Sequence, residues 1–206
     1  MGMDTSAFIA HLKTSPFYKG QIAHIEHLPW REAQYSEIEG LHPKIASLGL
    51  LPLYSHQAKA IDQTLEGKNI IVASPSASGK TLCYNIPVLN RILTQKGSCA
   101  LYLFPTKALA QDQLRGLREL GSGLGVRAST FDGDTPQDER AEIKRSTQIV
   151  LTNPDMLHLG ILPNHNSWAR LFRHLEFVVI DEAHTYRGVF GSHVANIIRR
   201  LRRICS

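Results

Sequence analysis

The stretch NIIVASPSASGKTL, residues 69–82, decides the fold of this chain. Its first half, residues 69–73, is an apolar run typical of a buried strand. Its second half nearly matches the phosphate-binding pattern Gly-x-x-x-x-Gly-Lys-[Ser/Thr], with Ser74 in place of the first glycine. Gly-Lys-Thr alone is short enough to arise by chance. The surrounding sequence must therefore decide whether this loop binds phosphate.

A helix is predicted directly after the loop, because apolar residues recur there at helical spacing: Leu82, Ile86, Leu89 and Leu93. The loop then lies between a strand and an amphipathic helix, where backbone N–H groups at the helix start can hold phosphates. Lys80 would reach the terminal phosphates, and the Thr81 hydroxyl would bind Mg²⁺. The alternative is a plain strand-to-helix turn made of small residues.

Strands and helices alternate along the rest of the chain. Apolar runs predict strands at residues 100–104, 126–131, 148–151 and 177–180. Helices are expected over about 106–120, from Thr135-Pro136, from Asn153-Pro154, and over about 191–204. Each of the two X-Pro starts combines a capping side chain with proline at the first helical position. Such alternation predicts an α/β fold, with a mostly parallel sheet covered by helices on both faces.

Two carboxylates follow the apolar strand at residues 177–180, which we expect to be central in the sheet. In an open parallel sheet, Asp181 and Glu182 then lie at the same edge as the phosphate loop. Asp181 can hold the magnesium shell, and Glu182 can orient or deprotonate an attacking water. The alternative is an ordinary helix cap with an acid in the first turn.

These elements resemble motifs I and II of the superfamily 2 DEAD/DEAH-box helicases, and residues 181–184 spell the DEAH box. Four further stretches resemble other motifs of that family, in the family's order: LYSHQAKAI (53–61), PTKALAQDQ (105–113), FDGDTP (131–136) and TNPDML (152–157). The flanking stretch TYRGVFGSHVANIIRRLRRI (185–204) is similar to the YprA-type branch of bacterial DNA helicases. The resemblance extends from about residue 18 to residue 206.

The resemblance implies a RecA-like P-loop NTPase domain that uses ATP and Mg²⁺. Its catalytic residues would be Lys80, Asp181 and Glu182, and its magnesium ligands Thr81 and Asp181. Gln57 would read adenine. The nucleotide-binding residues carried over from the family are Gln57, Ser74, Pro75, Ser76, Ala77, Ser78, Gly79, Lys80, Thr81 and His184.

The family's nucleic-acid contacts, carried over in the same way, are Thr106, Lys107, Gly133, Asp134, Asn153, Pro154 and Asp155. Thr106 and Asn153 stand at predicted helix starts, where hydroxyl, amide and backbone N–H groups suit phosphate. Lys107 adds a positive charge there. Helix capping alone explains Thr106 and Asn153 as an alternative, and a tight turn explains Gly133 and Asp134.

Composition is that of an ordinary globular protein of 206 residues, 43% hydrophobic and 20% charged, with a net charge of +5. No apolar run reaches the length of a membrane span, and the N-terminus is not a secretory signal. Cys83, Cys99 and Cys205 are odd in number and widely spaced, which argues against a disulfide framework or a zinc site. We therefore expect a cytoplasmic protein with no membrane partner.

Residues 1–50 are predicted to form an N-terminal extension that packs on a motor domain, residues 51–206. The resemblance implies the first of two RecA-like domains. The second domain, which supplies an arginine finger, is not among these 206 residues, so we expect little hydrolysis by the chain alone.

We interpret the chain as the ATP-binding motor domain of an ATP-dependent DNA helicase or translocase. Its partners would be the second RecA-like domain and DNA with a single-stranded segment. Two alternatives remain: an NTPase domain that remodels RNA or proteins, and a non-catalytic nucleic-acid-binding module.

Overall fold

The computed structural model describes residues 5–26, 32–74 and 78–205. The chain divides into two units, Met1–Ala33 and Gln34–Ser206. The first contains helix α1 (Thr5–Thr14), none of whose residues is buried. Residues 34–50 belong to the second unit and contribute Ile38 and Ile45 to its core. Packing of the whole segment 1–50 on the motor domain stays a prediction.

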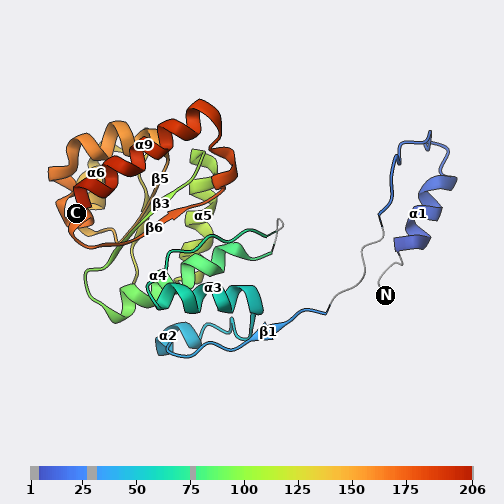
Figure 1. The fold of residues 1–206 in the computed structure, drawn as a ribbon, viewed down its shortest axis with the longest axis horizontal. Coiled ribbons are helices and arrows are strands. Elements are labelled where there is room, and N and C mark those ends of the chain that lie inside the picture. Colours follow the sequence, from blue (N-terminus) through green and yellow to red (C-terminus); the bar gives the residue numbers. More distant parts are fainter. Residues whose placement is uncertain (1–4, 27–31, 75–77, 206) are drawn as a thin grey trace. The chain divides into compact units, whose positions relative to one another are not determined.

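The larger unit contains all the remaining elements (Figure 1). Its strands are β1 (Tyr35–Ser36), β2 (Leu53–Tyr54), β3 (Cys99–Leu103), β4 (Ala128–Thr130), β5 (Ile149–Thr152) and β6 (Leu175–Ile180). Its α-helices are α2 (Pro43–Ala46), α3 (Ser55–Leu65), α4 (Lys80–Thr94), α5 (Lys107–Leu120), α6 (Gln137–Ser146), α7 (Pro154–Met156), α8 (Ala169–Arg173) and α9 (Gly188–Cys205). Shorter turns are the π-helical η1 (Leu157–Ile161) and the 3₁₀-helical η2 (Leu162–Trp168) and η3 (Ala183–Thr185).

Four strands form one parallel sheet in the order β4-β5-β3-β6. In its middle, Leu101 of β3 lies beside Val150 of β5 on one side and Val178 of β6 on the other. Helices follow the strands, so the predicted α/β fold with a mostly parallel sheet is confirmed. A separate antiparallel pair, β1 and β2, joins residues 35–36 to residues 53–54.

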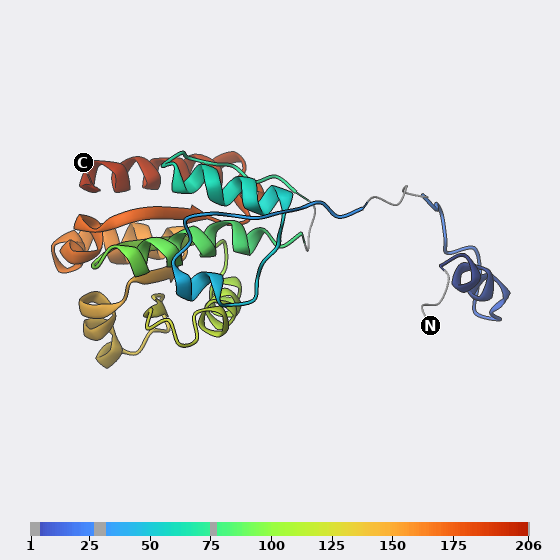
Figure 2. The ribbon, with the colours of Figure 1, turned by 90° about the horizontal axis from the view of Figure 1, so that it is seen from below.

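Both faces of the sheet are covered. Along β3, Ala100 and Tyr102 point into a core that α3, α4 and α5 share, whereas Leu101 and Leu103 point into a core with α6, α8 and α9. This alternation is the period of two that a strand imposes. Figure 1 shows α6 and α9 on one side of the sheet and α3 and α4 on the other, and Figure 2 shows α4 close to β6.

The segment 69–73 departs from the prediction. It forms no strand, and Ile71 is 97% exposed. The reason is that an apolar sequence favours a strand only where a neighbouring strand supplies hydrogen-bond partners. β6 differs too: it is the outermost strand of the sheet rather than a central one. Val178 and Ile180 on β6 are consequently partly exposed, at 41% and 38%.

The predicted helix starts have different outcomes. Thr106 and Asn153 cap α5 and α7, because their side-chain oxygens accept hydrogen bonds from the backbone N–H groups of Leu109 and Met156. The prediction for Thr135-Pro136 was wrong in detail: Pro136 is itself the N-cap of α6. The Thr135 hydroxyl instead accepts a hydrogen bond from the backbone N–H of Asp132, so it closes the preceding turn.

All three cysteines are free thiols, with Cys83 and Cys99 buried and Cys205 exposed. Within residues 5–26, 32–74 and 78–205, we find no helix with the length and apolar character needed to cross a membrane.

Candidate nucleotide and nucleic-acid sites

The predicted phosphate loop ends in a backbone turn that requires glycine. Gly79 is the N-cap of α4, with φ of 75°, in the left-handed region. A Cβ atom added there would lie 2.4 Å from the Gln57 amide nitrogen. Lys80 Nζ donates to the Ser74 carbonyl at 3.0 Å, and the hydroxyls of Ser74 and Ser78 are 2.6 Å apart. The predicted contacts Pro75, Ser76 and Ala77 lie outside the described residues.

Gln57 holds this loop from the first turn of α3. The residue is 3% exposed, and both ends of its amide are bonded within the chain. The Oε1 atom accepts from the Tyr54 backbone N–H at 3.0 Å, and the Nε2 atom donates to the Gly79 carbonyl at 3.0 Å. His56 Nε2 lies 3.0 Å from the Ser78 carbonyl oxygen. Gln57 thus supports the loop, while its reading of adenine stays a prediction.

The DEAH box begins immediately after β6. The Asp181 backbone N–H donates to the Leu103 carbonyl at 3.0 Å, which fixes the residue to β3. Glu182 has φ of 49°, a conformation that costs a non-glycine residue free energy and that recurs at active sites and ligand-binding segments. Its N–H donates to Asp181 Oδ1 at 2.8 Å, and its carboxylate lies 3.2 Å from His184 Nδ1. The structure therefore brings the two carboxylates and His184 together.

Tyr84 joins the helix of motif I to the carboxylate of motif II. Its hydroxyl donates to Asp181 Oδ2 at 2.9 Å. Burial, and then the charge of Asp181, raise the pKa of Tyr84 well above its usual value, whereas a hydrogen bond with Thr81 lowers it. Thr81 and Asp181, the two predicted magnesium ligands, thus both act on one hydroxyl. Their hydroxyl and carboxylate oxygens are the hard donors that Mg²⁺ prefers, so these residues fit the ion.

A second cluster lies at the ends of β3 and β4, where the sequence predicts nucleic-acid contacts. Lys107 Nζ donates to the Asp134 carboxylate at 2.7 Å, and this hydrogen bond raises the pKa of Lys107. A Cβ atom on Gly133 would lie 3.5 Å from Lys107 Nζ. The Asp134 backbone N–H donates to Oδ1 of Asp132, which is buried, and this bond fixes the turn. Lys107, Gly133 and Asp134 therefore meet, although they come from two loops.

The remaining predicted contacts follow β5. Because the strands are parallel, the loops after β4, β5 and β3 all leave the sheet at its carboxyl edge, the same edge as Asp181. Asn153 is partly buried as a helix cap, Pro154 is buried, and Asp155 is exposed. Neither their contact with nucleic acid nor that of the Lys107 cluster is tested by the geometry.

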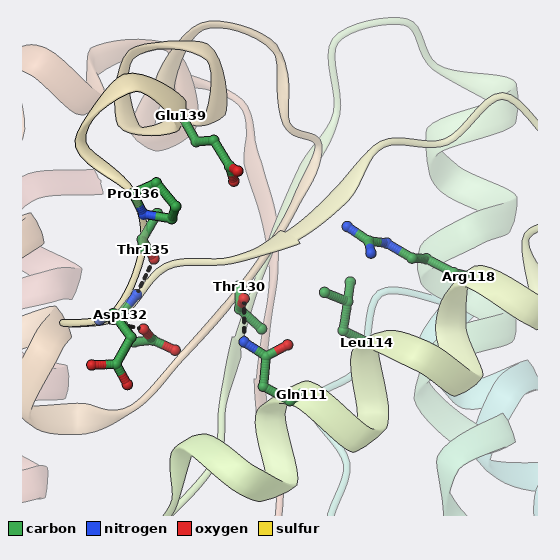
Figure 3. Close-up of a pocket in the computed structure, with 9 residues that line it drawn as sticks. Gln111, Leu114, Arg118, Thr130, Asp132, Thr135, Pro136 and Glu139 are labelled. Atoms are coloured by element: carbon green, nitrogen blue, oxygen red, sulfur yellow. Dashed lines mark hydrogen bonds between the residues drawn. The ribbon is translucent and has the colours of Figure 1, made fainter.

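A shallow polar hollow of about 240 Å³ adjoins this edge, between α5, β4 and the start of α6 (Figure 3). Gln111 of α5 bridges part of it by donating to the Thr130 hydroxyl at 2.9 Å. Asp134 is one of its lining residues, whereas the described residues of the phosphate loop and the DEAH box are not. The hollow therefore belongs to the predicted nucleic-acid edge rather than to the nucleotide site.

Sequence reasoning missed two polar side chains at the nucleotide site. Tyr84 is one, and a signal for it existed, because it follows Lys80 by four residues and so lies on the same helix face. Tyr186 is the other: burial and the charge of Asp181 raise the pKa of Tyr186 to about 12. Its buried hydroxyl has no hydrogen-bond partner among the described residues.

Comparison with known proteins places this geometry in a family. The family model described as DEAD/DEAH box helicase matches residues 54–206. The uncharacterised ATP-dependent helicase YprA of Bacillus subtilis is 52% identical over 169 residues, which are 81% of this chain and 23% of that protein. The ATP-dependent helicase HRQ1 of Saccharomyces cerevisiae is 42% identical over 203 residues, 96% of this chain and 19% of that protein.

Among solved structures, the helicase MrfA bound to DNA and AMPPNP superposes with a TM-score of 0.82 at 50% identity. That match covers 85% of this chain and 26% of the MrfA chain. It confirms the predicted RecA-like helicase fold, and the YprA match confirms the predicted branch. The chain spans about a fifth to a quarter of the length of YprA and HRQ1. By these matches, the chain belongs to the DEAD/DEAH box helicase family.

Proposed function

We propose that this chain is the ATP-binding motor domain of an ATP-dependent DNA helicase or translocase. The observation that carries the proposal is the junction of α4 and β6, where the helix of Lys80 and Thr81 is hydrogen-bonded through Tyr84 to Asp181. The relatives support ATP as the nucleotide, since they are named ATP-dependent helicases. MrfA, solved with DNA, supports DNA as the nucleic acid.

Each residue of the junction has a role that its position suits. Lys80 and the Gly79 turn bind the terminal phosphates at the start of α4. Thr81 and Asp181 hold Mg²⁺, which when bound neutralises charge on the phosphate oxygens. Glu182 orients the attacking water and accepts its proton, and His184 holds the Glu182 carboxylate. Gln57 fixes the loop and reads adenine.

The nucleic-acid edge completes the proposed motor domain. Thr106, Lys107, Gly133, Asp134, Asn153, Pro154 and Asp155 would follow the backbone of a single-stranded segment. A second RecA-like domain is the proposed partner that adds an arginine to the transition state. The free thiols suit a reducing compartment, so we propose the cytoplasm as the place of action.

Lys80→Ala tests the nucleotide site. We expect magnesium-dependent ATP binding, measured by calorimetry, to disappear, because the loop loses the cation that meets the phosphates. Lys96→Ala is the matched control, since this exposed lysine lies just beyond the other end of α4. Equal ATP affinity in both variants would remove the assignment of the loop.

Single-stranded DNA and RNA of equal length distinguish the proposed nucleic acid from its alternative. We expect the chain to bind the DNA at least as tightly as the RNA at one fixed salt concentration. Selective binding of RNA would contradict a DNA motor and favour an RNA-remodelling domain.

A further inference from the structure

The Tyr84 hydroxyl lies between two acceptors that come from different elements. It donates to Asp181 Oδ2 at 2.9 Å, at the end of β6, and to Gln113 Oε1 at 3.3 Å, on α5. The ring is held edge-on against the buried Tyr102, with centroids 5.3 Å apart and an interplanar angle of 86°. Packing of the ring therefore fixes where the hydroxyl lies, independently of its hydrogen bonds.

One proton cannot fully serve both acceptors, because a tyrosine hydroxyl has a single O–H. The carboxylate is the stronger acceptor, since a hydrogen bond to an ionised group is shorter and stronger than one to a neutral amide. The two distances agree with that order. The hydroxyl therefore donates mainly to Asp181, and a weaker hydrogen bond to Gln113 competes with this interaction.

We propose that Tyr84 is a positioning residue for the metal-binding carboxylate, and that Gln113 competes for its proton. The inference rests on the proposed function, in which Asp181 holds Mg²⁺. A ligating carboxylate is oriented by groups that hydrogen-bond to it, and loss of such a partner typically weakens metal affinity by about 10- to 100-fold. The Glu182 N–H occupies Oδ1, so Tyr84 sets the direction of the other oxygen.

Competition by Gln113 gives α5 an influence on the metal site. Gln113 lies on the helix that begins at Lys107 and is capped by Thr106, the proposed nucleic-acid contacts. A displacement of α5 that lengthens the Tyr84–Gln113 distance strengthens the hydrogen bond from Tyr84 to Asp181. A displacement that shortens this distance weakens that hydrogen bond. The three side chains thus connect the proposed nucleic-acid edge with the nucleotide site.

The test measures binding rather than turnover. A fluorescent ADP analogue is titrated into the chain in EDTA and then at rising Mg²⁺ concentrations, which gives the Mg²⁺ concentration that half-saturates the gain in nucleotide affinity. We expect Tyr84→Phe to raise that concentration about tenfold or more, while affinity in EDTA stays as in the wild type. The phenylalanine ring keeps the contact with Tyr102, and thermal unfolding verifies the fold.

Two further variants make the test specific. Tyr102→Phe removes a neighbouring buried hydroxyl that donates to Asn85 Oδ1 at 3.0 Å rather than to Asp181, and it should leave the magnesium dependence unchanged. Gln113→Leu removes the competitor and should lower the half-saturating Mg²⁺ concentration by up to about twofold, the limit for an evenly shared proton. The expected result is therefore a higher half-saturating Mg²⁺ concentration in Tyr84→Phe and a lower one in Gln113→Leu.

Three results would overturn the inference. If wild type and Tyr84→Phe respond equally to Mg²⁺, the positioning role is wrong while the proposed function stands. A rise in the half-saturating Mg²⁺ concentration of the Gln113→Leu variant would show that Gln113 supports the carboxylate rather than competing with it. If Mg²⁺ does not change the nucleotide affinity of the wild type, the metal role of Asp181 fails, and the proposed function fails with it.

Discussion

Asp134→Asn is expected to tighten the binding of single-stranded DNA. Lys107 is paired with Asp134 at 2.7 Å, so a phosphate that takes up Lys107 must first displace a carboxylate. The side chains of this pair are 46% and 80% exposed, which places it among exposed ion pairs of small net strength. Converted into an equilibrium ratio, that strength corresponds to a gain of about 1.4- to fivefold in DNA affinity.

Salt dependence and a charge-matched control make this prediction specific. Salt weakens both the Lys107–Asp134 ion pair and the repulsion between the Asp134 carboxylate and the phosphates. The gain in DNA affinity should therefore be largest at low salt. Asp138→Asn, an identical charge change on the exposed first turn of α6, should give a smaller gain, because Asp138 makes no ion pair with Lys107. Lys107→Ala should lower the slope of log affinity against log salt by about 0.7, the value for one phosphate of a single strand.

The measurement is fluorescence anisotropy with a labelled oligonucleotide at several salt concentrations. In the Lys107→Ala background, Asp134→Asn should raise DNA affinity no more than Asp138→Asn does, because the Asp134 carboxylate then has no lysine to pair with. Weaker DNA binding by Asp134→Asn alone would refute the reasoning, because the Asp134 carboxylate would then help to bind DNA instead of competing with a phosphate for Lys107.

The remaining predictions concern the nucleotide. Gln57→Ala should weaken GTP binding, because the Gly79 turn loses its support, and should weaken ATP binding still more, because adenine recognition is lost as well. Unchanged GTP affinity in calorimetry would contradict the support of the loop, and equal losses would contradict the reading of adenine. The 206-residue chain should bind ATP yet hydrolyse it well below about 1 s⁻¹ in a steady-state assay, with or without single-stranded DNA. The reason is that the proposed second RecA-like domain supplies the arginine finger, which raises the rate of hydrolysis by about 10³- to 10⁵-fold. A higher rate would show that the chain contains a complete catalytic site.

The parts of the fold that depend on local chemistry were predictable from the sequence. Runs such as residues 100–104 read as strands buried on both faces, and β3 is one. Thr106 and Asn153 cap helices because the partner N–H group lies three residues along the chain. Thr135 shows the limit of this reasoning. Its hydroxyl could accept either from the start of the following helix or from the preceding turn, and it accepts from the Asp132 backbone N–H.

Features that depend on distant partners were not predictable in the same way. Residues 69–73 have a strand-like sequence, but a strand exists only where another strand pairs with it. The bond between Tyr84 and Asp181 joins residues 97 positions apart. Helical spacing places Tyr84 on the face of Lys80, but nothing local indicates which carboxylate that face meets.

The edge position of β6 explains why a single hydroxyl has so much influence on Asp181. Of the described strands, only β3 pairs with β6, through bonds such as that between the Asp181 N–H and the Leu103 carbonyl. The backbone of Asp181 is thus held from one side of the strand. Its carboxylate has one oxygen bonded to the adjacent Glu182 N–H, a contact that moves with the same loop. Tyr84 is therefore the link that ties the carboxylate to α4, so its removal should affect Mg²⁺ binding more than it affects the fold.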